Sequence, residues 1–323
     1  RAGGQIQLPA LTTITGWGVR FDFEGNTTPV PALQTMSGAS FVLTAGVTLN
    51  FPALTALTSS TITVPAGATL NVPNLTNISG STLTLAGDGV FNSGMLSNID
   101  NMKFFLSGGA VFDRVSATSY RTDSAGVNAT IISVKDAGSR LDLSSVQTLR
   151  VIHGGCCSPY FQIFEALDGG VVDFSGVTTI NAVGDGDDTA IFKTRTGGQI
   201  LFPSLTTVTG YGVRFDFEGD SNPVPTLQTM SGASFVVPAG SALSFPALTT
   251  VSYSTITVPA GSTFNAPNLT SLTSSTLTLT GNAVFNSGML SNIDNMKFFL
   301  SGGAVFDRVS ATSYRTDSAG VNA

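Results

Sequence analysis

The sequence predicts an all-β fold, a parallel β-solenoid (β-helix) of stacked coils of about 21 residues. Three observations lead to this prediction. Residues 90–129 recur letter for letter as residues 284–323, and the same offset of 194 residues pairs Arg1 with Arg195. A shorter period of about 21 residues lies inside the long one, and apolar residues alternate with polar ones in short runs. Long-range periods are typical of repeat architectures, and alternation is typical of strands.

Each short unit begins with an apolar-x-apolar triplet, which a Leu-Thr-x-apolar segment follows. Clear examples are the triplets 49–51 and 70–72, followed by segments that contain Leu54 and Leu75. From Ile6 to Ile200, the steps between first apolar positions are 22, 21, 21, 21, 21, 29, 31 and 28 residues. Residues 1–194 therefore form one unit of eight coils, three of them lengthened by insertions. Residues 195–323 form a second, incomplete copy in one continuous elongated solenoid.

A second strand-like run follows in each unit and ends at a small-residue turn, as in residues 61–64 before Ala66 and Gly67. Glycine at the turn allows the positive φ that a sharp bend requires. No stretch keeps helical spacing, so we expect two or three short strands per coil. Stacked coils then place like residues in interior ladders. The predicted interior includes Leu11, Leu33, Leu54, Leu75 and Leu96, together with Phe51, Phe91, Phe112, Phe174 and Phe202.

Composition agrees with a narrow core under neutral outer faces. Only 11% of residues are charged, the net charge is −6, and the 14 basic residues form no cluster. Nucleic-acid binding requires a basic footprint, so the sequence excludes it. No apolar run is long enough to span a bilayer. Stacking of about 4.8 Å per coil predicts roughly 38 Å for eight coils and roughly 65 Å for the chain.

The Leu-Thr-x-apolar frame, the Gly-Gly corners and the nearly identical units resemble the parallel β-solenoid repeats of large secreted surface proteins, such as adhesins and extracellular fibre proteins. The resemblance covers the whole chain. It implies a non-enzymatic rod at the cell surface or outside the cell, which acts as a fibre, stalk or adhesin shaft. Because the chain begins and ends within the repeat array, we expect it to be a segment of a longer tandem array without capping elements. Such ends favour self-association into filaments, end to end or as covalent tandem units, and cell-surface glycans are candidate partners.

The alternative function is a polysaccharide-binding or polysaccharide-cleaving β-helix, since one fold supports many functions. The middle residues of the triplets are predicted to point outward, which would place Asp113, Asp142 and Asp173 about 5 Å apart. Carboxylates at that spacing share a cation or shift each other's pKa. We favour a structural ladder that runs from Asn50, Asn71 and Asn92 into Asp, relieved by Arg114, Arg140 and solvent. The single histidine, His153, and the lack of a Lys or Arg beside the carboxylates weigh against catalysis.

The acidic loop 184–188 is the best cation candidate in the chain. Asp185, Asp187 and Asp188 alternate with glycine, and such a loop can wrap several oxygens around calcium. The full calcium-loop and nonapeptide patterns are absent, so an ordinary solvated loop is the favoured interpretation. The sequence indicates no other cofactor.

Cys156 and Cys157 are adjacent in the longest insertion. Zinc ligands need two to four intervening residues, and adjacent cysteines close only a strained ring. Three states remain open: a vicinal disulfide, which we favour, a cross-link to another chain, and two reduced thiols. An extracellular protein favours oxidation. Metal binding with His153 is the remote option.

Two further surface motifs recur in both units. One is a charged row, for which a structural or lateral-contact role is favoured over a catalytic carboxylate pair: Arg20, Asp22 and Glu24, repeated as Arg214, Asp216 and Glu218. The other is an outward Thr-x-Thr array, which suggests ice binding as a third function. Its members are Thr61, Thr63, Thr82, Thr84, Thr255, Thr257, Thr276 and Thr278. Thr favours exposed strand positions for its own sake, and the array spans only two adjacent coils per unit, so ice binding ranks last.

The three long steps predict one surface patch. The insertions 122–128, 152–160 and 182–188 lie on consecutive coils, and each follows the Leu-x-x-apolar strand. We therefore expect them to project from the same side of the solenoid. Loops on a rigid scaffold are the usual place for binding residues.

Overall fold

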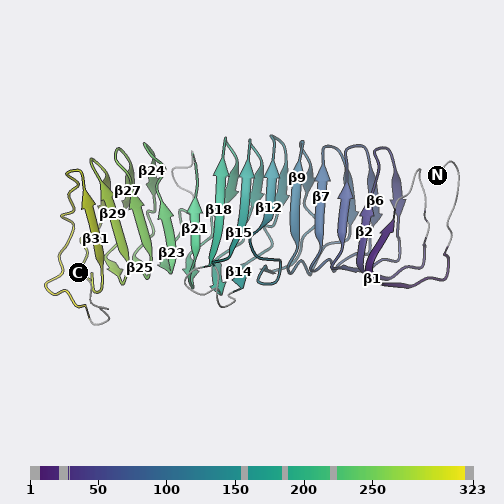
Figure 1. Cartoon of the computed structure of the whole chain (residues 1–323), viewed down its shortest axis with the longest axis horizontal. Coiled ribbons are helices and arrows are strands. Elements are labelled where there is room, and N and C mark those ends of the chain that lie inside the picture. The colour runs from purple at the N-terminus through teal and green to yellow at the C-terminus, as the bar shows by residue number, and fades with distance from the viewer. Residues whose placement is uncertain are drawn as a thin grey trace.

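The chain forms one stack of parallel strands along a single long axis (Figure 1). The computed structural model describes residues 8–21, 28, 30–153, 159–183, 188–218 and 224–316, and within these ranges it contains strands and no helix. Neighbouring strands come from successive coils and pair in parallel. The predicted fold class, an all-β parallel solenoid, is confirmed. Within the described part of the chain, no helix is long and apolar enough to cross a membrane.

One side of the solenoid is a 14-stranded sheet, called the long sheet here. It runs the length of the described chain without interruption. Its strands are β1 (Thr13–Phe21), β2 (Thr35–Val42), β5 (Thr61–Val64), β7 (Thr82–Ala86), β9 (Lys103–Ser107), β12 (Ala129–Lys135), β15 (Phe161–Leu167), β18 (Thr189–Arg195), β21 (Val213–Asp216), β23 (Ala233–Val236), β26 (Thr255–Val258), β29 (Thr276–Thr280) and β31 (Lys297–Ser301), with β4 (Ala56–Thr58) joined to β2.

The predicted triplets form a second side, the triplet face, as three shorter sheets. These contain β3 (Thr48–Asn50), β6 (Thr69–Val72) and β8 (Val90–Ser93); β10 (Val111–Phe112), β13 (Arg140–Asp142), β16 (Val171–Asp173) and β19 (Gln199–Leu201); and β24 (Ala242–Ser244), β27 (Thr263–Ala266) and β30 (Val284–Ser287). The third side is a seven-stranded sheet of β11 (Ser119–Arg121), β14 (Thr148–His153), β17 (Thr179–Val183), β20 (Thr207–Thr209), β22 (Thr229–Ser231), β25 (Thr250–Ser252) and β28 (Ser271–Thr273).

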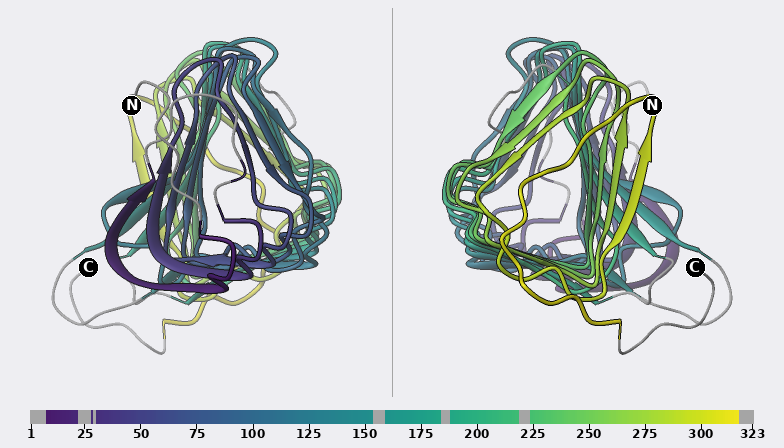
Figure 2. Two further views of the ribbon diagram at one scale, coloured as in Figure 1. Left: turned by 90° about the vertical axis from the view of Figure 1, so that its right-hand side faces the viewer. Right: turned by 90° about the vertical axis from the view of Figure 1, so that its left-hand side faces the viewer.

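The three sides give the solenoid a triangular cross-section (Figure 2). Each coil passes from the triplet face to the seven-stranded side and then to the long sheet, where a glycine-containing turn returns it to the triplet face. Strand pairing reproduces the predicted steps. Leu49 pairs with Leu70, 21 residues later, and Leu141 pairs with Val172, 31 residues later. The insertions therefore lengthen a corner without shifting the ladder.

The interior is a continuous apolar column. Of the predicted leucine ladder, Leu33, Leu54, Leu75 and Leu96 are fully buried, whereas Leu11 is only partly buried. The five predicted interior phenylalanines are all buried. Thr76, next to Leu75, is exposed, so the strand phase read from the sequence is correct.

A stack of phenylalanines inside the long sheet was not predicted. Phe164, Phe192, Phe215 and Phe235 occupy one row on successive coils, with ring centroids 4.8, 5.6 and 5.1 Å apart. The rings pack nearly parallel, at interplanar angles of 20°, 22° and 17°. Residue 195 begins the second unit, so this stack runs from the first unit into the second.

The junction between the two units is built like any other pair of coils. The boundary at residues 194 and 195 lies inside β18, which pairs with β15 on one side and β21 on the other. On the other sides, β16 pairs with β19 and β17 with β20. All three sides of the solenoid therefore continue from one unit to the next.

Tyr120, on β11 of the seven-stranded sheet, points into the interior of an insertion-bearing coil. Its ring is fully buried, and its hydroxyl donates to the carbonyl oxygen of Met102 at 2.6 Å. Burial raises the pKa of the Tyr120 phenol well above its usual value, and the nearby negative charge of Asp100 raises it further. The phenol is therefore a neutral hydrogen-bond donor at ordinary pH.

Candidate functional site

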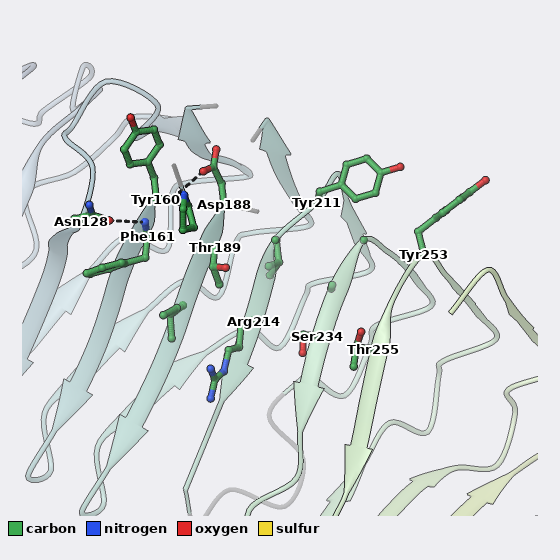
Figure 3. Close-up of a pocket in the computed structure, with 16 residues that line it drawn as sticks. Asn128, Tyr160, Phe161, Asp188, Thr189, Tyr211, Arg214, Ser234, Tyr253 and Thr255 are labelled. Atoms are coloured by element: carbon green, nitrogen blue, oxygen red, sulfur yellow. Dashed lines mark hydrogen bonds between the residues drawn. The ribbon is translucent and has the colours of Figure 1, made fainter. Parts of the chain in front are cut away.

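A groove of about 720 Å³ opens where the insertion-bearing coils of the first unit meet the first coils of the second (Figure 3). Its walls come from both units. Asn128, Tyr160, Phe161, Asp188 and Thr189 contribute from the first unit, and Tyr211, Arg214, Ser234, Tyr253 and Thr255 from the second. The groove lies on the outer face of the long sheet, beside the corner that leads in from the seven-stranded sheet.

The floor of the groove is one outward row of the long sheet. Strand pairing places Ile191 beside Arg214, Arg214 beside Ser234, and Ser234 beside Thr255. Side chains of adjacent parallel strands in register point to the same face. The floor is therefore apolar at its first-unit end and polar along the second unit.

Two tyrosines form the rim at the corner. The exposed fractions of Tyr211 and Tyr253 are 48% and 58%, and their ring centroids lie 6.4 Å apart at an interplanar angle of 73°. They belong to coils separated by one intermediate coil, which has Gly232 at this corner. Because Gly232 has no side chain, the two rings meet across it and both project outward in Figure 3.

Close backbone contacts explain the glycines of this corner. A Cβ at Gly212 would lie 1.6 Å from the carbonyl oxygen of Asp188, and a Cβ at Gly232 would lie 1.6 Å from that of Gly210. Both glycines also have positive φ, +81° and +72°. The backbone amide of Ala190 donates to the carbonyl oxygen of Gly212 at 2.7 Å, which ties the two units together at the groove.

The three insertions meet at the first-unit end of the groove, as far as they are described. The amide of Phe161 donates to the side-chain oxygen of Asn128 at 3.2 Å, and the amide of Tyr160 donates to Oδ1 of Asp188 at 3.0 Å (Figure 3). Deeper in the same corner, the side chain of Gln162 hydrogen-bonds to Thr122. These contacts join described parts of all three insertions on one side of the solenoid, as the sequence predicts.

Two polar atoms in the groove residues lack partners. Asp188 is fully buried, and its Oδ2 has no hydrogen-bond partner. The Nε of Arg214 is also buried and unpaired, while Nη2 of Arg214 lies 3.6 Å from Oδ2 of Asp216. Buried polar atoms normally have partners, so each such atom requires an explanation.

The charged row of the second unit is a set of ion pairs between coils. Nη2 of Arg195 lies 2.8 Å from Oδ2 of Asp216, and Nε of Arg195 lies 3.4 Å from Oε2 of Glu218. Phe215 and Phe217, between the charged residues, are buried. In the first unit, Asp22 and Glu24 lie outside the described residues. The arrangement in the second unit shows charge pairing between two of its neighbouring coils.

The aspartate row differs from the sequence prediction. Asp142 pairs with Asp173 in the strand register, and Asp173 alternates with the buried Val172 and Phe174, so its outward direction agrees with the prediction. Asp173 is nevertheless only 7% exposed and is therefore not solvated. Arg140 contacts Asp173 and lies 3.7 Å from Oδ2 of Asp142, so the expectation of no Lys or Arg beside these carboxylates was wrong. The third aspartate, Asp113, remains exposed. Arg140, which lies two residues before the triplet centre Asp142, neutralises part of this row.

The asparagines of the same row form side-chain hydrogen bonds between coils. The Asn71 amide donates to the Asn50 oxygen at 2.8 Å, and the Asn92 amide donates to the Asn71 oxygen at 3.3 Å. The threonine arrays are also in register, Thr61 with Thr82 and Thr255 with Thr276. Both features are outward rows of neutral polar side chains.

The predicted cation loop and cysteine pair fall mainly on residues that the structure does not describe. Asp185, Asp187, Cys156 and Cys157 lie outside the described residues. Asp188 is described, and its Oδ1 is engaged by Tyr160. Among the described residues, no three His, Cys, Asp or Glu side chains come together as metal ligands.

Sequence reasoning missed the tyrosine rim. The signal was the difference between the two copies, because Tyr211 and Tyr253 occupy the positions of Trp17 and Ser59 in the first unit. No protein-family profile, curated protein or solved structure matches this chain.

Proposed function

We propose that this chain is a structural part of an extracellular tandem array, which serves as the shaft of a fibre, stalk or adhesin. The observation that carries the proposal is the junction inside β18. All three sides and the phenylalanine stack continue across it. A repeat that joins its neighbour in this way lengthens a single rod instead of adding a separate domain.

The surface chemistry supports a passive role. Stacked Asn side chains hydrogen-bond from coil to coil, and the charged residues of the junction form ion pairs with one another. Stacked like charges would repel, whereas neutral polar rows and paired charges allow coils to repeat indefinitely. A low charge content therefore fits a function that depends on length.

The aspartate row gives little support to the alternative of a polysaccharide-cleaving enzyme. Arg140 contacts Asp173, and the backbone amides of Ser144 and Ser175 donate to the carboxylates of Asp142 and Asp173 at 2.9 and 2.8 Å. These carboxylates accept hydrogen bonds from the backbone amides of the turns and form ion pairs with Arg140.

The test is to lengthen the rod. A second copy of residues 1–194 inserted at the junction should add roughly 38 Å to the length seen by electron microscopy, at about 4.8 Å for each of eight coils. Small-angle scattering should show the same increase with an unchanged cross-section. An added unit that folds as a separate body beside the rod would contradict the proposal.

Two further measurements separate the proposal from its alternatives. Incubation with acidic and neutral glycans should release no sugar; turnover abolished by Asp142→Asn would establish the enzyme instead. An antibody against the chain should label intact source cells or their secreted fibres. Labelling only after permeabilisation would contradict an extracellular location.

A further inference from the structure

We propose that the groove at the unit junction is a binding site for a neutral polysaccharide chain. This site goes beyond a shaft function, and its described lining residues come from both units of the present chain. Its argument rests on the shape of the groove, on its two rim tyrosines and on the charges of its floor.

The groove suits an extended ligand that lies along the solenoid axis. Its floor residues come from the strands β18, β21, β23 and β26, and Phe161 on β15 extends it by one more coil. Four intervals between five coils correspond to roughly 19 Å. A short linear oligosaccharide fits such a surface better than a compact ligand, which usually requires an enclosed pocket.

The rim supplies amphipathic rings. Tyr211 and Tyr253 present about half of their surface to solvent, and Phe161 is 39% exposed. Aromatic rings offer an apolar face, and the tyrosines add hydroxyls at their outer ends. Sugars have the complementary chemistry, because their C–H faces pack on rings while their hydroxyls hydrogen-bond at the edges. Exposed aromatic residues gathered at one place are a common mark of an interaction surface.

The polar groups specify a neutral ligand. Among the described residues that line the groove, Asp188 and Arg214 are the charged ones, and they carry opposite charges. Ser234 and Thr255 add hydroxyls along the floor. An acidic polymer would instead require a cationic floor.

The two units contribute different parts of the site. Asn128, Tyr160 and Asp188, which are described residues of the three insertions, line the first-unit wall. The first three coils of the second unit provide Tyr211, Gly232 and Tyr253. If the chain belongs to a tandem array, as the proposed function holds, the groove would recur at each junction, about 38 Å apart. Several weak sites on one rod would then bind one polysaccharide with increased avidity.

The two copies provide matched control variants. Ser59 has φ of 50° and Tyr253 has the same φ, so Tyr253→Ser introduces the residue that the fold already accepts at this corner. Tyr211→Trp likewise introduces the residue found at Trp17. The first variant removes a rim ring, and the second keeps one.

The experiment is affinity gel electrophoresis of the full chain through gels that contain hydroxyethyl cellulose, galactomannan or laminarin, with dextran sulfate as the acidic comparison. We expect retardation by at least one neutral polymer. Tyr253→Ser and Tyr211→Ala should each weaken the apparent affinity by about tenfold, as loss of a central aromatic contact usually does. Tyr211→Trp should remain within about threefold of the wild type. Circular dichroism would verify that all variants stay folded.

Three outcomes would overturn the proposal. One is the absence of retardation by every neutral polymer at millimolar sugar concentration. Another is retardation that Tyr253→Ser and Tyr211→Ala leave unchanged, which would place the binding elsewhere. The third is retardation by dextran sulfate alone, which would contradict a neutral ligand. None of these results would alter the rod-lengthening test, so the two proposals fail separately.

Discussion

Replacement of Gly232 by Ala tests whether backbone contact between coils holds the junction corner. A Cβ at this position would lie 1.6 Å from the carbonyl oxygen of Gly210 and 2.6 Å from its carbonyl carbon. The neighbouring atoms are backbone, so no side chain can rotate away to relieve the contact. The coils would have to separate at the corner where Gly212 donates to the Gly232 carbonyl at 2.8 Å.

Gly261→Ala is the matched control. Its φ of +75° is close to the +72° of Gly232, but no atom lies within 4 Å of a Cβ built there. Both variants therefore share the cost of a left-handed alanine, about 1 kcal/mol. Overpacking adds about 1–3 kcal/mol, and a weakened coil-to-coil hydrogen bond adds about 1 kcal/mol, for Gly232→Ala alone. We expect Gly232→Ala to lower the free energy of unfolding by about 2–4 kcal/mol more than Gly261→Ala.

Urea denaturation followed by circular dichroism would measure the difference, and amide hydrogen exchange would locate it. Repeat proteins often unfold in parts, so the exchange measurement is needed to assign the loss to the junction coils. Faster exchange should be confined to the coils next to Gly232. Equal stability of the two alanine variants would show that backbone approach does not determine this corner.

Four further predictions follow from the described contacts. Leu75→Asp should disrupt the local stack of coils, because burial of an unpaired charge in the dry apolar column costs several kcal/mol. Thr76→Ala should change the free energy of unfolding by about 0.5 kcal/mol or less. Equal melting temperatures of the two variants would contradict the strand phase. Tyr120→Phe should cost about 1 kcal/mol through the lost hydrogen bond. The raised pKa of Tyr120 means that the folded state keeps the phenol proton after the unfolded state loses it, so wild-type stability should fall above about pH 10, and more steeply than in Tyr120→Phe. Asp173→Asn should cost about 1 kcal/mol at low salt and less at 1 M salt; a loss independent of salt would argue against an ion-pair origin. Ser59→Tyr should leave the melting temperature nearly unchanged, because the second copy carries Tyr at the same φ, and strong destabilisation would show that the two corners are not equivalent.

The sequence was sufficient to predict the fold because every coil repeats the same pattern of apolar and polar positions. An apolar residue recurs in each coil at the position of Leu75, as Leu in most coils and as Ala or Val in the insertion-bearing ones. A buried residue in one coil therefore packs against a buried residue in the next. Insertions did not confuse the register, since Phe112 still pairs with Leu141 across the first long step. The repeat period itself indicates which distant residues are in contact, and the sequence of a non-repetitive globular protein does not give this directly.

The site was harder to predict because its parts come from different periods. Tyr253 and Asp188 are 65 positions apart in the sequence and lie on coils of different units, yet both line one groove. Neither belongs to a motif with a known spacing. Asp173 was assigned to solvent because alternation gives direction but not neighbours, and the position of Arg140 between two coils decides its burial.

The separation of scaffold and site follows from the same geometry. Corner residues such as Ser59 and Tyr253 share a backbone conformation and are exposed, so we expect their identity to have little effect on coil stacking. Interior positions have no such freedom, because each is in contact with the coils on both sides. A tandem array built from these units can therefore vary its junction rims from copy to copy while its length and its cross-section remain constant. The exchange of Trp17 for Tyr211 and of Ser59 for Tyr253 is the variation expected when the column is constrained and the corner is not.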